Sequence, residues 1–187
     1  MDRIEEAVLF AMEAHRGQLR KSSPIDYFWH PLGVGRLLAE EGCDEEIVAA
    51  GVLHDVLEDT AATADDLRRR FGERVAKVVE GVSESDKSLS WEKRKGATLR
   101  ALRGASEGIR LVIAADKLDN LRSIAADRER IGDSVWTRFN RGKEKQAWYH
   151  REISRILGED RPLFAALARE VTSLFETEGE PPGSSPS

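Results

Sequence analysis

Residues 49–60 set one imidazole and three carboxylates, those of His54, Asp55, Glu58 and Asp59, within an otherwise apolar, helix-like run. Burying such groups costs free energy unless a charged partner binds them. A divalent metal ion is the simplest such partner, because imidazole nitrogens and carboxylate oxygens are common metal ligands. A fold that buries this run must bring further ligands to it, and the pattern favours a hydrolytic metal site.

The spacing of these groups fits a single helix. If residues 45–58 are helical, His54 and Glu58 stand four positions apart on one face. Asp55 and Glu58 stand three apart on nearly the same face. The same pattern is also typical of a helix C-terminus whose imidazole and acids meet solvent, so the His-Asp pair alone leaves both interpretations open.

Apolar residues recur at helical spacing through most of the chain, and the alternation typical of β-strands is hard to find. This periodicity predicts helices at about 4–12, 31–42, 45–58, 63–72, 75–82, 91–102, 109–125 and 162–175, with two more between 135 and 156. Asp44 and Thr63 are suited to cap helix starts, and Gly42 and Gly72 to follow helix ends. The sequence therefore predicts an all-α fold.

Asp116 lies in the predicted helix over residues 109–125, where most neighbouring residues are apolar. Burying its carboxylate requires compensation. Metal ligation would supply it, and a buried salt bridge to an arginine is the alternative. His30, upstream of the His-Asp pair, is a further plausible ligand.

The 187 residues, 40% of them hydrophobic, are enough to bury a core, and we expect one domain over residues 1–176. Residues 177–187 are rich in Glu, Pro, Gly and Ser, and we expect a disordered tail there. The lone Cys43 cannot form an internal disulfide. No apolar stretch approaches the roughly 20 residues that span a bilayer, and no signal-peptide pattern begins the chain, so we expect a cytoplasmic protein without membrane association.

The formal net charge of −5 argues against general nucleic-acid binding, which relies on a basic excess. Arg16, Arg20 and Lys21 nevertheless form a local positive cluster. It suits either a few phosphate groups or a solvated helix end. A second basic segment, residues 136–149, contains several aromatic residues and is either a functional motif or an amphipathic helix that packs on the core.

Five separated motifs share their order with one known family. They are Ala14–Lys21, Tyr27–Pro31, Leu53–Thr60, Phe71–Gly72 and Ala115–Arg122. In that order they resemble the HD-domain hydrolases of the RelA/SpoT type, which remove the 3′-pyrophosphate from guanosine tetra- or pentaphosphate. The resemblance covers about two thirds of the chain. It implies an HD-domain helical bundle. The long RelA/SpoT-type proteins add a synthetase domain after the hydrolase, and these 187 residues are too few to hold one, so we expect a stand-alone hydrolase.

The resemblance also implies roles for individual residues. It implies four ligands for a divalent metal, usually manganese: His30, His54, Asp55 and Asp116. It implies that Glu58 and Asp59 orient or activate the attacking water. It implies substrate contacts from Arg20, Lys21, Tyr27, Lys117 and Asn120, with the first two beside the phosphates.

Two features depart from the family pattern. Asp119 stands where an aromatic residue or histidine often precedes the asparagine, and Tyr27 is separated from Pro24 where the family often has a Pro-Tyr pair. Both departures concern pocket walls rather than metal chemistry. His15, in the first motif, is suited to a supporting role near the phosphates, and we expect His150 on a helix surface.

The partner implied is a small nucleotide, and the sequence leaves room for an oligomer. Two other functions stay open at this point. The same site could hydrolyse another nucleotide or a phosphorylated dinucleotide, or the chain could be a non-catalytic nucleotide sensor. The presence of both Glu58 and Asp59 favours an enzyme, because a sensor would not need a water-activating pair.

Overall fold

The computed structural model describes residues 2–20, 24–84 and 88–175. Its helices are α1 (Arg3–Ala14), α2 (Trp29–Glu40), α3 (Glu45–Val52), α4 (Val56–Asp59), α5 (Ala64–Phe71), α6 (Glu73–Val82), α7 (Trp91–Arg103), α8 (Glu107–Ile131), the 3₁₀ helix η1 (Gly132–Arg138), α9 (Gly142–Leu157) and α10 (Pro162–Phe175). Within those described ranges, β pairing is limited to one isolated antiparallel bridge between Leu19 and Asp26. The predicted all-α fold class is confirmed.

Side-chain caps explain where several helices begin. The Asp44 carboxylate accepts hydrogen bonds from the backbone N–H groups of the first turn of α3. Thr63 and Asp66 form a reciprocal capping box at the start of α5. Gly72, with φ +91°, separates α5 from α6 in a conformation that other residues rarely adopt. The predicted caps and this predicted helix end are confirmed.

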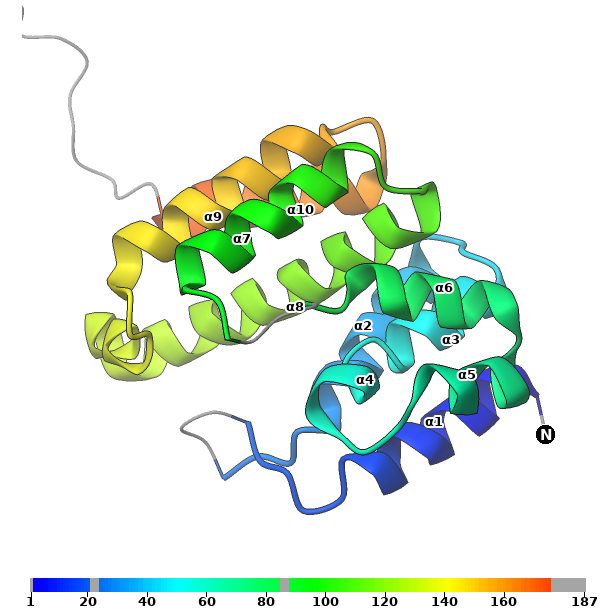
Figure 1. Ribbon diagram of the computed structural model, residues 1–187. Helices are drawn as coiled ribbons and strands as arrows, with labels where there is room; N and C mark the ends of the chain where they lie inside the picture. The colour runs from blue at the N-terminus through cyan, green and yellow to red at the C-terminus, as the bar shows by residue number, and fades with distance from the viewer. Residues whose placement is uncertain (1, 21–23, 85–87, 176–187) are drawn as a thin grey trace, which may run out of the picture.

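Helix α8 is the central element of the fold. Figure 1 shows α7, α9 and α10 on one side of it and α1 to α6 on the other. It packs against α9 and α10 on the first side and against α2, α3 and α6 on the second. Its middle is buried from Leu111 to Ala115 and again at Leu118 and Leu121. Any polar side chain on this part of α8 is therefore placed at the centre of the molecule.

The prediction of one helix over residues 45–58 is wrong, because α3 ends at Val52 and α4 begins at Val56. The interruption has a local cause. His54 Nδ1 lies 2.8 Å from the carbonyl oxygen of Gly51. In a continuous helix that carbonyl would accept the backbone N–H of Asp55, so the imidazole takes the place of a helical bond. The turn moves His54 and Asp55 off a regular helix face.

Two predictions about the last third are settled by packing. His150 is buried rather than on a surface, because its ring stacks on Phe175 of α10 and its Nδ1 lies 2.8 Å from the carbonyl of Gln146. The segment 136–149 is not one helix, since it contains the end of η1, a turn and the first half of α9. The predicted tail, residues 177–187, lies outside the described residues.

Among the helices described, none has the length and apolar character needed to cross a membrane.

Candidate metal centre and active site

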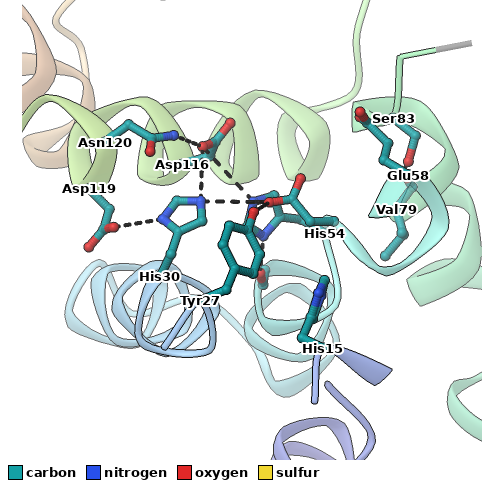
Figure 2. A network of polar contacts seen from close by, with 12 residues as sticks. His15, Tyr27, His30, His54, Glu58, Val79, Ser83, Asp116, Asp119 and Asn120 are labelled. Carbon is teal, nitrogen blue, oxygen red and sulfur yellow. Dashed lines mark hydrogen bonds and ion pairs between the residues drawn. The ribbon is translucent and has the colours of Figure 1, made fainter. Parts of the chain in front are cut away.

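The predicted metal ligands meet beside the centre of α8, although they come from three separate parts of the fold. His30 is in the first turn of α2, His54 and Asp55 are in the turn between α3 and α4, and Asp116 is on α8. Figure 2 shows His30, His54 and Asp116 pointing toward one another. One ligand atom from each of these three lies within 4.8 Å of the other two.

Both histidines present Nε2 to the cluster. His54 Nδ1 is held by the Gly51 carbonyl, and His30 Nδ1 lies 2.7 Å from Asp119 Oδ2. Carbonyl and carboxylate oxygens only accept, so each Nδ1 donates its proton, and in the neutral ring the lone pair is on Nε2. This outer support is typical of histidines that bind a metal.

Neighbouring side chains also hold the two carboxylates in place. Asp55 Oδ2 lies 2.9 Å from His54 Nε2 and 3.8 Å from His30 Nε2, and it accepts a hydrogen bond from the Tyr27 hydroxyl. Asp116 Oδ1 lies 3.3 Å from His30 Nε2. These contacts keep one oxygen of each carboxylate next to the imidazole nitrogens.

The neighbours of Asp116 on α8 complete its surroundings. Asn120 Nδ2 donates to Asp116 Oδ1 at 2.5 Å, and Lys117 Nζ donates to Asp116 Oδ2 at 2.6 Å. The buried salt bridge that the sequence left open is therefore made to a lysine. It leaves Oδ1 facing the histidines.

These residues fit a divalent metal ion. Within the described part of the chain, the buried His54 Nε2 has no hydrogen-bond partner, although Asp55 Oδ2 lies 2.9 Å away. A buried ring nitrogen without a hydrogen bond costs free energy, and a metal ion would satisfy it. Two imidazole nitrogens with two carboxylates suit manganese, iron, cobalt or zinc.

The charges of the cluster shift its pKa values in opposite directions. Burial acts to lower the pKa of His54, but the carboxylates of Asp55 and Asp116 outweigh it and raise the value to about 9. Burial acts to raise the pKa of Asp116, but Lys117 and the two histidines hold it well below the ordinary carboxyl range. A divalent cation competes with the histidine proton, so its affinity is expected to rise with pH.

Helix α4 places the predicted acidic pair, Glu58 and Asp59, beside the ligands. Both line the same cavity of about 210 Å³ as His30, His54 and Asp116. Glu58 Oε1 accepts a hydrogen bond from the backbone N–H of Glu84 at 2.7 Å. Burial raises the pKa of Glu58 despite that bond. A carboxylate with a raised pKa is well suited to accept a proton from water.

The first motif supports α4 from the outside. His15 is buried, and its Nδ1 lies 2.9 Å from Gln18 Oε1. The other side of that amide, Gln18 Nε2, donates to the carbonyl oxygen of Asp59 at 2.8 Å. His15 therefore acts on the acidic pair through Gln18.

A second cavity, of about 500 Å³, adjoins the first. The two share the lining residues Tyr27, Lys95, Lys117, Asn120 and Tyr149. The remaining walls of the second cavity include four arginines and two aromatic residues: Arg20, Arg94, Arg138, Arg141, Trp91 and Phe139. A basic, partly aromatic cavity beside a metal site suits a phosphorylated ligand with a planar ring.

The structure places the predicted substrate residues around these two cavities. Tyr27, Lys117 and Asn120 line both, and Arg20 lines the larger one. Lys21 lies outside the described residues. The predicted substrate residues that are described thus share the surroundings of the metal cluster.

The segment 136–149 is divided between the core and the wall of the larger cavity. Trp136 is buried in the core, with the Lys143 ammonium 5.7 Å from the centre of its ring. Phe139 and Arg141 line the larger cavity. Packing holds one part of the segment in place, and the other part contributes to the cavity wall.

Sequence reasoning missed Lys95, which lines both cavities. Its ammonium lies 2.5 Å from Glu84 Oε1 and 4.8 Å from the centre of the Tyr149 ring. Arg94 donates to the other oxygen of Glu84 at 2.7 Å. An Arg-Lys pair near a helix start is indistinguishable in sequence from a solvated one.

Comparison with known proteins identifies the family. The sequence profile described as HD domain matches residues 7–141. The chain is 36% identical over 177 residues to the guanosine-3′,5′-bis(diphosphate) 3′-pyrophosphohydrolase MESH1 of Danio rerio, covering 93% of each protein. It is 40% identical over 132 residues to the bifunctional (p)ppGpp synthase/hydrolase SpoT of Escherichia coli, covering 67% of this chain and 18% of SpoT.

A solved structure agrees with the sequence comparisons. It is described as a metazoan ortholog of SpoT that hydrolyzes ppGpp, and it matches with a TM-score of 0.76 and 28% identity over 92% of this chain and 95% of the other. The profile match covers most of the chain, and the match to MESH1 spans nearly all of both proteins. This chain therefore belongs to the HD-domain family, in the group of RelA/SpoT-type hydrolases that includes MESH1.

Proposed function

We propose that this protein is a metal-dependent phosphohydrolase that converts guanosine 3′,5′-bis(diphosphate) into GDP and pyrophosphate. The observation that carries the proposal is a cluster of two histidines and two carboxylates that adjoins a basic cavity. Relatives named for this reaction, such as MESH1 of Danio rerio, support the choice of substrate.

His30, His54, Asp55 and Asp116 would hold the metal, and we propose Mn²⁺. When bound, the ion supplies positive charge for the phosphate oxygens and acidifies water. The four ligand side chains keep fixed orientations, because each is held by a neighbour outside the cluster. A cytoplasmic location, where the nucleotide substrate would be met, is part of the same proposal.

Glu58 and Asp59 position the attacking water and take its proton. The water oxygen bonds to the phosphorus attached to the 3′-oxygen of the ribose, and the bond between that phosphorus and the 3′-oxygen breaks. The 3′-oxygen leaves as a hydroxyl after protonation, giving GDP, and the two phosphates leave together as pyrophosphate. The raised pKa of Glu58 suits it to receive the first proton.

The larger cavity would hold the nucleotide. Lys95 and Lys117 line both cavities and bring positive charge next to the metal cluster, where the phosphates must lie, and Arg20 adds positive charge in the larger cavity. Trp91 and Phe139, which also line this cavity, offer aromatic surface to the purine. The negative charge of the whole chain is thus compatible with a locally basic substrate site.

A turnover screen tests the proposal. The purified protein is incubated with Mn²⁺ and a panel of nucleotides, and released pyrophosphate and orthophosphate are measured separately. Guanosine tetraphosphate should yield GDP and pyrophosphate. Hydrolysis of a different nucleotide alone would reject the substrate but keep the site, whereas tight nucleotide binding without turnover would identify a sensor.

A further inference from the structure

We propose that Asp119 is a positioning residue that orients His30 for metal binding and couples it to Arg20. The inference rests on the proposed function only in taking His30 as a metal ligand. The Asp119 side chain does not line the cavity that contains the metal cluster and the acidic pair on α4.

The contacts of Asp119 carry the first step. His30 is almost fully buried, and its Nδ1 donates to Asp119 Oδ2 at 2.7 Å (Figure 2). A carboxylate acceptor at Nδ1 fixes the ring direction and keeps the proton on that nitrogen. Nε2 is then left to face Asp116 and Asp55, at 3.3 and 3.8 Å. Asp119 therefore decides which nitrogen of His30 is offered to a metal.

The same carboxylate oxygen also faces the substrate side. Arg20 lies 3.5 Å from Asp119 Oδ2 and donates to Asn120 Oδ1 at 3.4 Å. Arg20 lines the larger cavity, whereas His30 lines the smaller one. One carboxylate thus joins a residue of the basic wall to a metal ligand.

Gly33 provides independent support. It lies inside α2, one turn after His30, where glycine is unfavourable for a helix and no left-handed backbone requires it. A Cβ added there would overlap Asp119 Oδ1 and lie 2.9 Å from Asp119 Cγ. The absence of a side chain at position 33 makes room for the Asp119 carboxylate against α2.

Metal binding without nucleotide tests the inference. Mn²⁺ binding to the metal-free protein is measured by isothermal titration calorimetry for the unaltered protein, Asp119→Ala and Asp119→Asn. Loss of an outer partner of a ligating histidine typically costs about 10- to 100-fold in metal affinity, and we expect that loss for Asp119→Ala. Asp119→Asn keeps an oxygen acceptor and should recover much of the affinity. Asp133→Ala, which removes an exposed carboxylate beyond the end of α8, is the control.

Imidazole ¹⁵N NMR of the metal-free protein supplies a readout independent of activity. The unaltered protein should show a protonated Nδ1 in His30, and Asp119→Ala should lose that signature. A double-mutant cycle then adds Gly33→Ala, which should weaken Mn²⁺ binding alone but cause no further loss in Asp119→Ala, where the carboxylate is gone. Gly104→Ala, whose Cβ would meet open space, is the matched glycine control.

The outcomes separate the two proposals. Failure of the unaltered protein to bind Mn²⁺ would overturn the proposed function. Equal Mn²⁺ affinity in the unaltered protein and Asp119→Ala would overturn only the role of Asp119, as would additive losses from Gly33→Ala and Asp119→Ala. If Gly33→Ala does not fold, the Asp119→Ala and Asp119→Asn affinities decide the question.

Discussion

Replacing Glu58 by glutamine separates proton transfer from metal binding. The glutamine carbonyl can accept the same hydrogen bond from the backbone N–H of Glu84, 2.7 Å from Oε1, so the position of the side chain should be retained. Its amide has no basicity. Loss of a general base typically lowers the rate 10²- to 10⁴-fold, so we expect kcat to fall by about 100-fold or more, or about 2.7 kcal/mol of transition-state stabilisation.

The assay combines kcat at saturating Mn²⁺ with elemental analysis of the bound metal. Metal content should be unchanged, because Glu58 is not among the proposed ligands His30, His54, Asp55 and Asp116. Glu80→Gln, a matched change at an exposed residue paired with Arg68 on the surface, should leave the rate within about twofold. An unchanged rate in Glu58→Gln would refute its role as a base, and loss of metal together with rate would make Glu58 a ligand.

Three further variants test other parts of the site. Asp55→Ala should lose bound metal by elemental analysis and abolish turnover, since Oδ2 lies 2.9 Å from His54 Nε2; full activity would remove the basis of the ligand assignment. Arg20→Ala should lower kcat/KM, mainly by raising KM. The loss should correspond to about 1.5 to 3 kcal/mol of transition-state stabilisation, because charge-assisted phosphate contacts are worth that much. An unchanged KM would place Arg20 outside the substrate site. His150→Asn tests stability toward acid. Burial lowers the pKa of His150 from 6.5 to about 4. The neutral, buried ring therefore makes its full contribution to the free energy of unfolding above pH 6.5, and this contribution is lost as the pH falls through 4. We compare the free energy of unfolding in denaturant at pH 7 and pH 4. Between these two pH values the variant should lose roughly 3 kcal/mol less of it than the unaltered protein, and equal losses would contradict this role of His150.

Local chemistry made much of the fold predictable. Caps such as Asp44 and Thr63 act within one turn of the chain, so residue type and spacing were enough to locate the helix starts. The break between α3 and α4 was missed because apolar periodicity does not register a side chain that takes a backbone carbonyl. His54 bonds to Gly51 in this way, and the helix stops.

The candidate site was predictable where a motif carried it and unpredictable where only tertiary contact did. His54 and Asp116 stand out in sequence because they interrupt apolar helical patterns. Lys95 gave no such signal, and Asp119 stood out only as a departure from the family pattern, because their partners Glu84 and His30 are 11 and 89 residues away along the chain. The burial of His150 likewise depends on α10, which covers it from another part of the chain.

In the proposed reaction water attacks the phosphorus attached to the 3′-oxygen, and an isotope experiment identifies the attacked atom. Guanosine tetraphosphate is hydrolysed with Mn²⁺ in ¹⁸O-labelled water, and the products are analysed by mass spectrometry. We expect GDP without label and pyrophosphate carrying one labelled oxygen. Label in GDP, or labelled orthophosphate as the first product, would contradict it.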